Sequence, residues 1–189
     1  LIGSNINFDA GAKHLAQYVA ILTGSSTPLI SFSASEVVVY IASGNGCINI
    51  SGREFSVPEE TGIYVCVGEA FSISNTGNQA LKAIITVCPG DTEMRMLEQM
   101  PDNFDSNYPN RICTYDQESR DTMADRHLME LVNSKLGCEQ VTQFIGEIPK
   151  SRAAFHHHLY EEAIYIMSGS GVMWTTTKKA NVIPGDLIF

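Results

Sequence analysis

The sequence has no run of basic residues, no long apolar stretch and no closely spaced pair of cysteines. Lysine and arginine number 12 against 21 aspartates and glutamates, which gives a formal net charge of −9. An acidic chain without a basic patch is poorly suited to bind nucleic acid or an anionic membrane. No apolar segment reaches the ~20 residues of a membrane-spanning helix, and no signal peptide is visible. We therefore expect neither nucleic acid nor membrane as a partner.

The cysteines are odd in number and scattered, and none forms a C-x-x-C pair. This pattern argues against a disulfide framework or a zinc ribbon and favours a reducing compartment, so we expect a cytoplasmic protein whose cysteines are buried as small hydrophobic residues. The chain begins at Leu1 rather than at methionine and ends in a strand-like run. We expect it to be part of a longer product.

Short runs rich in Val, Ile, Tyr or Cys, separated by Gly, Pro, Asn or Ser, predict a mostly β protein. The predicted strands are 18–23, 37–42, 47–50, 63–67, 71–74, 81–87, 127–132 and 141–148, with a turn at 133–137. Residues 89–121 are polar and aperiodic and are typical of a connector, except that 94–100 favours a short helix.

The chain also contains an internal repeat. Tyr-Ile-Ala-Ser-Gly-Asn-Gly at 40–46 matches Tyr-Ile-Met-Ser-Gly-Ser-Gly at 165–171, an offset of 125 residues (165 − 40). The same offset pairs Glu36 with Glu161 and Val57 with Val182. A shared seven-residue pattern with agreeing flanks indicates two copies of one small β-unit.

One segment of the second copy has the composition of a metal site. His156 and His158 are two residues apart, so on an extended strand both side chains point to the same face. Glu162 shares their parity if that strand continues. Two imidazoles and a carboxylate form a facial set of ligands for a divalent transition metal. A polar strand face without metal is the alternative.

This segment resembles the first motif of the cupin superfamily, G-x5-H-x-H-x3/4-E-x6-G, read here from His156 through Glu162 to Gly169. Only the opening glycine is missing, because position 150 is Lys150. Residues 184–189 look like the start of the second cupin motif, whose histidine would fall near position 196. The resemblance implies a metal held inside a small barrel by the two histidines, the glutamate and that fourth histidine.

The repeat and the resemblance together predict an all-β protein of two tandem cupin-type jelly-roll barrels. The expected domains are an N-terminal cupin without metal ligands at 1–88, a polar connector at 89–121, and a C-terminal cupin at 122–189 that is incomplete. In the first copy the four ligand positions fall on Ser31, Ser33, Val37 and Phe71, which do not form a transition-metal site. We expect the first barrel to have a structural role.

The predicted metal ligands are thus His156, His158 and Glu162, with Fe, Mn, Ni, Co or Zn as candidate metals. Tyr160 shares the parity of the ligands and is a candidate acid, base or hydrogen-bond donor, with a packing role as the alternative. His157 points to the other face.

The resemblance favours a metal-dependent enzyme, of dioxygenase type, acting on a small polar metabolite, and a homodimer. The alternative is a non-catalytic ligand-binding or storage-like bicupin with a structural or vestigial site.

Overall fold

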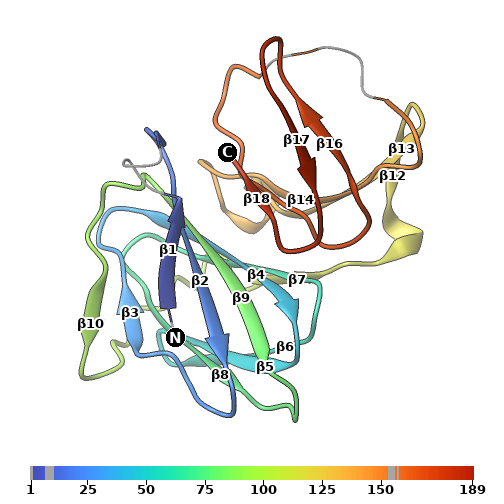
Figure 1. Ribbon diagram of the computed structural model, residues 1–189. Helices are drawn as coiled ribbons and strands as arrows, with labels where there is room; N and C mark the ends of the chain where they lie inside the picture. Colours follow the sequence, from blue (N-terminus) through green and yellow to red (C-terminus); the bar gives the residue numbers. More distant parts are fainter. Residues whose placement is uncertain (1, 7–10, 153–155, 157) are drawn as a thin grey trace. The chain divides into compact units, whose positions relative to one another are not determined.

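The computed structural model describes all residues except 1, 7–10, 153–155 and 157. The chain divides into two compact units, Leu1–Ala154 and Phe155–Phe189 (Figure 1), and each unit is described by itself. No helix formed by the described residues is long and apolar enough to cross a membrane.

The first unit contains three antiparallel sheets, and the two larger ones form a barrel (Figure 1). The six-stranded sheet has the order β1 (Ile2–Ile6), β2 (Ala16–Leu22), β9 (Leu81–Cys88), β4 (Glu36–Ser43), β7 (Thr61–Val65) and β11 (Ile112–Thr114). The five-stranded sheet has the order β10 (Arg95–Leu97), β3 (Leu29–Ser31), β8 (Ala70–Asn75), β5 (Gly46–Ile50) and β6 (Arg53–Val57). From β2 to β9 each strand passes to the other sheet, except that β5 and β6 form a hairpin within the five-stranded sheet. This order is that of a jelly roll, and it confirms the predicted all-β, cupin-type fold for this barrel.

Hydrophobic side chains fill the space between the two sheets. Alternate residues of each strand point inward. On β4, for example, Val37, Val39 and Ile41 belong to the core cluster, and Ile48 and Ile50 of β5 join them. The interior of this barrel is thus a packed apolar core.

The four strands of the second unit repeat the pairing of β4–β7 and β5–β6. Strand β15 (Ile164–Tyr165) pairs with β18 (Leu187–Ile188), and β16 (Gly171–Trp174) pairs with β17 (Lys179–Val182). Ile164 faces Ile188 as Val39 faces Ile63. Every residue pair in these two ladders has a counterpart 125 residues earlier, since Gly171 faces Val182 as Gly46 faces Val57. The repeat seen in the sequence is therefore also present in the structure, because the same residue pairs face each other in both copies.

A third sheet extends the repeat upstream with a slightly different offset. It contains β12 (Asp121–Met123), β13 (Arg126–Val132) and β14 (Gln143–Glu147). Leu128 faces Gly146 as Ile2 faces Ala20, an offset of 126 residues (128 − 2). Both hairpins have a register shift at the same place, before Val132 and before Ile6. Between the hairpin and β15 the second copy is therefore one residue shorter than the first, and the first copy begins at β1.

The connector is not helical at 94–100: residues 95–97 form the edge strand β10, which pairs with β3. The prediction of a short helix was wrong because the Met/Leu pattern there follows strand pairing rather than a helical face. Beyond it the chain contains two single 3-10 turns, Gln117–Ser119 and Ser134–Leu136, the latter closed by Gly137 in the left-handed conformation.

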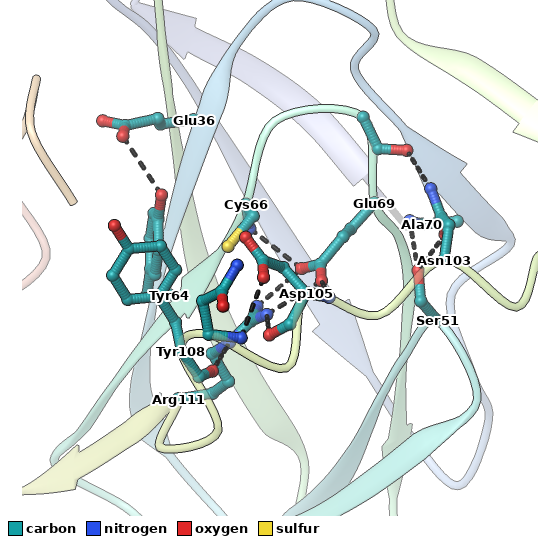
Figure 2. Close-up of polar contacts among 12 residues, drawn as sticks. Glu36, Ser51, Tyr64, Cys66, Glu69, Ala70, Asn103, Asp105, Tyr108 and Arg111 are labelled. Atoms are coloured by element: carbon teal, nitrogen blue, oxygen red, sulfur yellow. Dashed lines mark hydrogen bonds and ion pairs between the residues drawn. The ribbon is translucent and has the colours of Figure 1, made fainter. Parts of the chain in front are cut away.

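A buried ion pair attaches the connector to the first barrel (Figure 2). The Arg111 guanidinium donates to both carboxylate oxygens of Glu69, at 2.6 and 2.8 Å, and the two side chains are 0% and 2% exposed. The same guanidinium lies 4.3 Å from the ring centroid of Phe104. Backbone N–H groups of Cys66 and Asp105 donate to the same carboxylate. The pair is therefore bidentate and its carboxylate is fully hydrogen-bonded, as a buried charge requires.

A second buried carboxylate anchors the segment that precedes β14. Glu36 accepts hydrogen bonds from the Tyr64 hydroxyl at 3.1 Å, the Cys138 thiol at 3.4 Å and the backbone N–H groups of Glu139 and Gln140. Burial raises the pKa of Cys138 to about 12, with a further contribution from the negative charge of Glu36. Burial likewise raises the pKa of Cys66 to about 11.

Replacing Arg111 by methionine should lower the free energy of unfolding by about 3–5 kcal/mol, because Glu69 is then left charged and buried without its partner. The matched control is Arg120→Met, since Arg120 pairs with Glu147 at the surface and such pairs contribute about 1 kcal/mol or less. Urea unfolding of both variants measures the difference. An equal loss of unfolding free energy in the two variants would contradict the assignment of Arg111 as the residue that attaches the connector to the first barrel.

We expect Cys66 and Cys138 to resist alkylation by iodoacetamide at pH 8, because only the thiolate reacts and both thiols stay protonated. All five cysteines, which are free thiols, should be labelled after unfolding in urea, as measured by mass spectrometry of peptides.

The folded-state pKa values of Cys66 and Cys138 both lie above the ordinary 9.0. The contribution of these two thiols to the free energy of unfolding should therefore be fully present below about pH 8. It should fall as the pH rises through 9 to 12, because the unfolded chain loses these protons first. Rapid labelling of either thiol in the native protein would contradict the raised pKa values.

Candidate metal site

The segment with the predicted ligands does not form a strand. The described residues from 156 to 163 have no strand pairing, and the chain bends at Leu159 and Tyr160 before β15 begins at Ile164. The expectation of one extended strand from His156 to Glu162 was therefore wrong. The Leu159–Tyr160 bend changes the direction of the chain, so the parity argument does not extend to Glu162.

Two pairs of the predicted ligands nevertheless lie close together, but the three described side chains are not grouped closely enough to hold a metal ion. The His158 Nδ1 atom is 3.1 Å from Glu162 Oε2, with the two side chains 29% and 26% exposed. The ring centroids of His156 and His158 are 4.9 Å apart. Because Glu162 occupies the Nδ1 side of His158, the Nε2 atom of that imidazole is the one left to face a ligand.

Tyr160 stacks on His158, with ring centroids 4.8 Å apart and planes at 20°. Its side chain is otherwise open to solvent, at 68% exposed. The ring contact gives Tyr160 a place beside the predicted ligands, and its role as acid, base or hydrogen-bond donor stays a prediction.

The first barrel shows which positions of the repeat point inward. The predicted counterparts of His156 and His158 were Ser31 and Ser33, but Ser33 is exposed and the Ser31 hydroxyl donates to the backbone carbonyl of Glu69. The side chains that enter the core from this strand are those of Ile30 and Phe32.

This one-residue correction has a structural reason. The β1–β2 and β13–β14 hairpins are related by 126 residues, whereas the strands after Glu36 are related by 125. The registers require one residue fewer in the second copy somewhere between the hairpin and the following strand. We assign this difference to the loop after His158, so that His156 and His158 correspond to Ile30 and Phe32. The first copy then has four residues between Phe32 and Val37, and the second has three between His158 and Glu162.

The two adjacent glutamates of the second copy correspond to side chains with opposite directions. Val37, the counterpart of Glu162, is in the hydrophobic core. Glu36, the counterpart of Glu161, points away from the core and holds the backbone at 139–140. This contrast favours Glu162 over Glu161 as the inward carboxylate. Phe71, at the fourth ligand position, is also in the core and pairs with Ile30.

Two imidazoles and a carboxylate fit a divalent transition metal in donor chemistry. Within the part of the chain that the structure describes, no three His, Cys, Asp or Glu side chains are grouped closely enough to hold a metal ion. His157 lies outside the described residues. His127 shares a hydrogen bond with the Thr122 hydroxyl at 3.2 Å on the β12–β13 hairpin, which gives it a local partner.

No protein-family model and no curated protein matches the chain. Among solved structures it is similar to protein Ylba from E. coli, with a TM-score of 0.71 and 17% identity over 98% of this chain and 72% of that one. It is also similar to the Schizosaccharomyces pombe Cnp3 cupin domain, with a TM-score of 0.41 and 18% identity over 47% of this chain and 63% of that domain. A third similar structure is a predicted oxalate decarboxylase from Thermotoga maritima, with a TM-score of 0.41 and 23% identity over 47% of this chain and 78% of that one.

At these identities the likeness concerns the fold alone. The match to Ylba extends along nearly the whole chain, and it agrees with the jelly-roll order of the first unit. The cupin fold is supported, and the activity of none of these proteins transfers to this chain.

Proposed function

We propose that residues 122–189 belong to a second cupin barrel in which His156, His158 and Glu162 bind one divalent transition metal. One observation carries the proposal: the corresponding side chains of the first barrel, Ile30, Phe32 and Val37, all lie in its core. Two imidazoles and a carboxylate enclosed in a barrel at these positions would be unfavourable unless a cation or hydrogen bonds compensated them. A divalent metal provides that compensation.

The proposed protein is a metal-dependent enzyme of dioxygenase type acting on a small polar metabolite. The bound metal would supply Lewis-acid activation of an oxygen-bearing group or of O2. Among this chain's own residues, Glu162 orients the His158 ring through Nδ1. The Tyr160 ring stacks on the same imidazole, and its hydroxyl is our candidate for holding or moving a proton.

A non-catalytic bicupin that binds or stores a ligand is the second candidate. It is favoured by the first barrel, which keeps the jelly-roll fold with an interior filled entirely by hydrophobic side chains at the corresponding positions. The two candidates differ in turnover: only the enzyme consumes O2 or substrate when the metal is present.

Protein purified at neutral pH and loaded with Fe, Mn or Zn should contain about one metal per chain, and His158→Ala should abolish this binding. Glu162→Gln should weaken it, whereas Glu161→Gln should leave it unchanged because the Glu161 position faces away from the interior. His127→Ala is a second matched control. Elemental analysis after gel filtration measures the content.

Two outcomes would overturn the proposal. The first is a metal content near zero with all three metals. The second is an equal loss of bound metal in Glu161→Gln and Glu162→Gln, because the proposed inward direction of Glu162 would then be wrong.

A further inference from the structure

Two lysines stand at the tip of the β16–β17 hairpin, in the same unit as the predicted metal ligands. Lys178 and Lys179 are exposed, and residues 156–189 contain no other lysine and no arginine. In a chain with a net charge of −9, these two side chains supply the fixed positive charge of that unit. The direction in which each lysine points therefore decides whether a cation faces the interior of the second copy.

The register of the hairpin gives the two lysines opposite directions. Every pair of the β16–β17 ladder matches a pair of β5–β6 at an offset of 125 residues. Lys179 therefore corresponds to Glu54, and Lys178, one residue earlier, corresponds to Arg53. Val57 of β6 is in the core, and Arg53 shares its parity. Because side chains alternate along a strand, Lys178 belongs to the inner face and Lys179 to the outer face.

A tight turn holds Lys178 in this register. The backbone N–H of Thr175 donates to the carbonyl oxygen of Lys178 at 2.8 Å. The Thr175 hydroxyl accepts hydrogen bonds from the backbone N–H groups of Thr177 and Lys178, at 3.4 and 3.1 Å. In the first copy Ile50 faces Arg53 at the corresponding place. The correspondence thus extends to the tip, and the four-carbon stem of Lys178 gives its ammonium reach from a fixed backbone.

The hairpin tip and the predicted ligands belong to the same end of the second copy. Glu162 lies seven residues before Gly169, where the turn into β16 begins, and Thr175 lies five residues after Ser170 (169 − 162 and 175 − 170). Strand β15 runs toward this turn and β16 runs back from it, so Glu162 and Thr175 both lie at the end away from the turn. His158 is at that end as well, since its Nδ1 atom is 3.1 Å from Glu162.

The first copy shows how a cation is used at this place. The Arg53 guanidinium lies 4.3 Å from the ring centroid of Phe104, a residue of the connector, and Phe55 stacks on the same ring with centroids 6.2 Å apart. The connector thus covers this end of the first barrel. In the second copy the positions of Arg53 and Phe55 hold Lys178 and Ala180. The cation is kept and the stacking ring is lost, which suits a small anion better than an aromatic ring.

We propose that Lys178 determines substrate specificity by binding a carboxylate group of the substrate, whose other end coordinates the metal. This inference rests on the proposed function and names its substrate class as a small carboxylic acid in ionised form. An ammonium group has three hydrogen-bond donors, and its hydrogen bonds to a carboxylate are charge-assisted. The small side chain of Ala180 leaves room for the carboxylate beside Lys178.

A pair of matched probes tests the proposal on the full chain loaded with Co(II). The first probe is succinic monohydroxamate, whose hydroxamate binds metals through two oxygen atoms and whose far end is a carboxylate. The second probe carries a neutral primary amide in place of that carboxylate. Titration followed by the visible Co(II) bands gives the affinity of each probe. We expect the carboxylate probe to bind about ten-fold more tightly at low salt, as a hydrogen bond to a charged group allows, and this preference should shrink as salt rises.

Two neighbouring lysines provide the variant and its control. Lys178→Gln should abolish the preference for the carboxylate probe without changing the metal content, and Lys178→Arg should keep most of it. Lys179→Gln removes the same charge from the adjacent, outward residue and should leave the preference unchanged. Elemental analysis measures the metal content, and circular dichroism with thermal unfolding verifies that the variants are folded.

The outcomes separate this inference from the proposed function. An equal preference in wild-type protein and Lys178→Gln, both with full metal content, would overturn the role of Lys178 and leave the metal site standing. Equal loss of the preference in Lys178→Gln and Lys179→Gln would also overturn it, because net charge rather than direction would then be responsible. Wild-type protein that takes up no Co(II) would overturn the proposed function, and the role of Lys178 with it.

Discussion

Alternation of side chains along the strands is the constraint on which the rest of the structure depends. In a jelly roll the two sheets face each other, so every second residue of a strand must enter the interior. In the first barrel Ile30, Phe32, Val37 and Val39 occupy inward positions, and the interior is a packed core. The register of β4–β7 and β5–β6 recurs in β15–β18 and β16–β17 of the second copy. Under the proposed function, His156, His158 and Glu162 would take the positions of Ile30, Phe32 and Val37, and the chemistry of the second copy would be a change of side chains at inward positions.

Two buried carboxylates hold the segments outside this framework. Glu69 binds Arg111 from the connector, and Glu36 binds the backbone around Gln140 ahead of β14. Neither carboxylate interacts with the barrel interior. Both are satisfied by several donors, which is the condition under which a buried charge is tolerated. The connector is thus held by directional contacts together with Met94, Phe104 and Ile112, which pack against the core.

The sequence predicted the long strands, the repeat and the cupin-type fold, because period-two patterns and a seven-residue match are strong local signals. It missed β3 and β6, which are too short or too exposed to show alternation, and it misread 94–100, where β10 exists only through pairing with β3. It paired His156 and His158 with Ser31 and Ser33, which are not core residues, whereas Ile30 and Phe32 are. A one-residue difference in loop length is invisible to a single offset, and the registers before and after the loop reveal that it exists. The bend at Leu159 and Tyr160 was missed for a similar reason, since spacing alone does not distinguish a strand from a turn.

The two copies differ in how they can be stabilised. None of the described residues of 155–189 is buried, whereas the first barrel has a continuous core. Exchanging Ile30, Phe32 and Val37 for His156, His158 and Glu162 removes apolar contacts from the centre of a barrel and introduces groups that resist dehydration. Under the proposed function, a metal that binds only the folded second copy stabilises it by RT ln(1 + [M]/Kd), where [M] is the free metal concentration. The metal would then take over, in the second copy, the stabilising role that the hydrophobic side chains have in the first, and function and folding of the second copy would depend on the same three side chains.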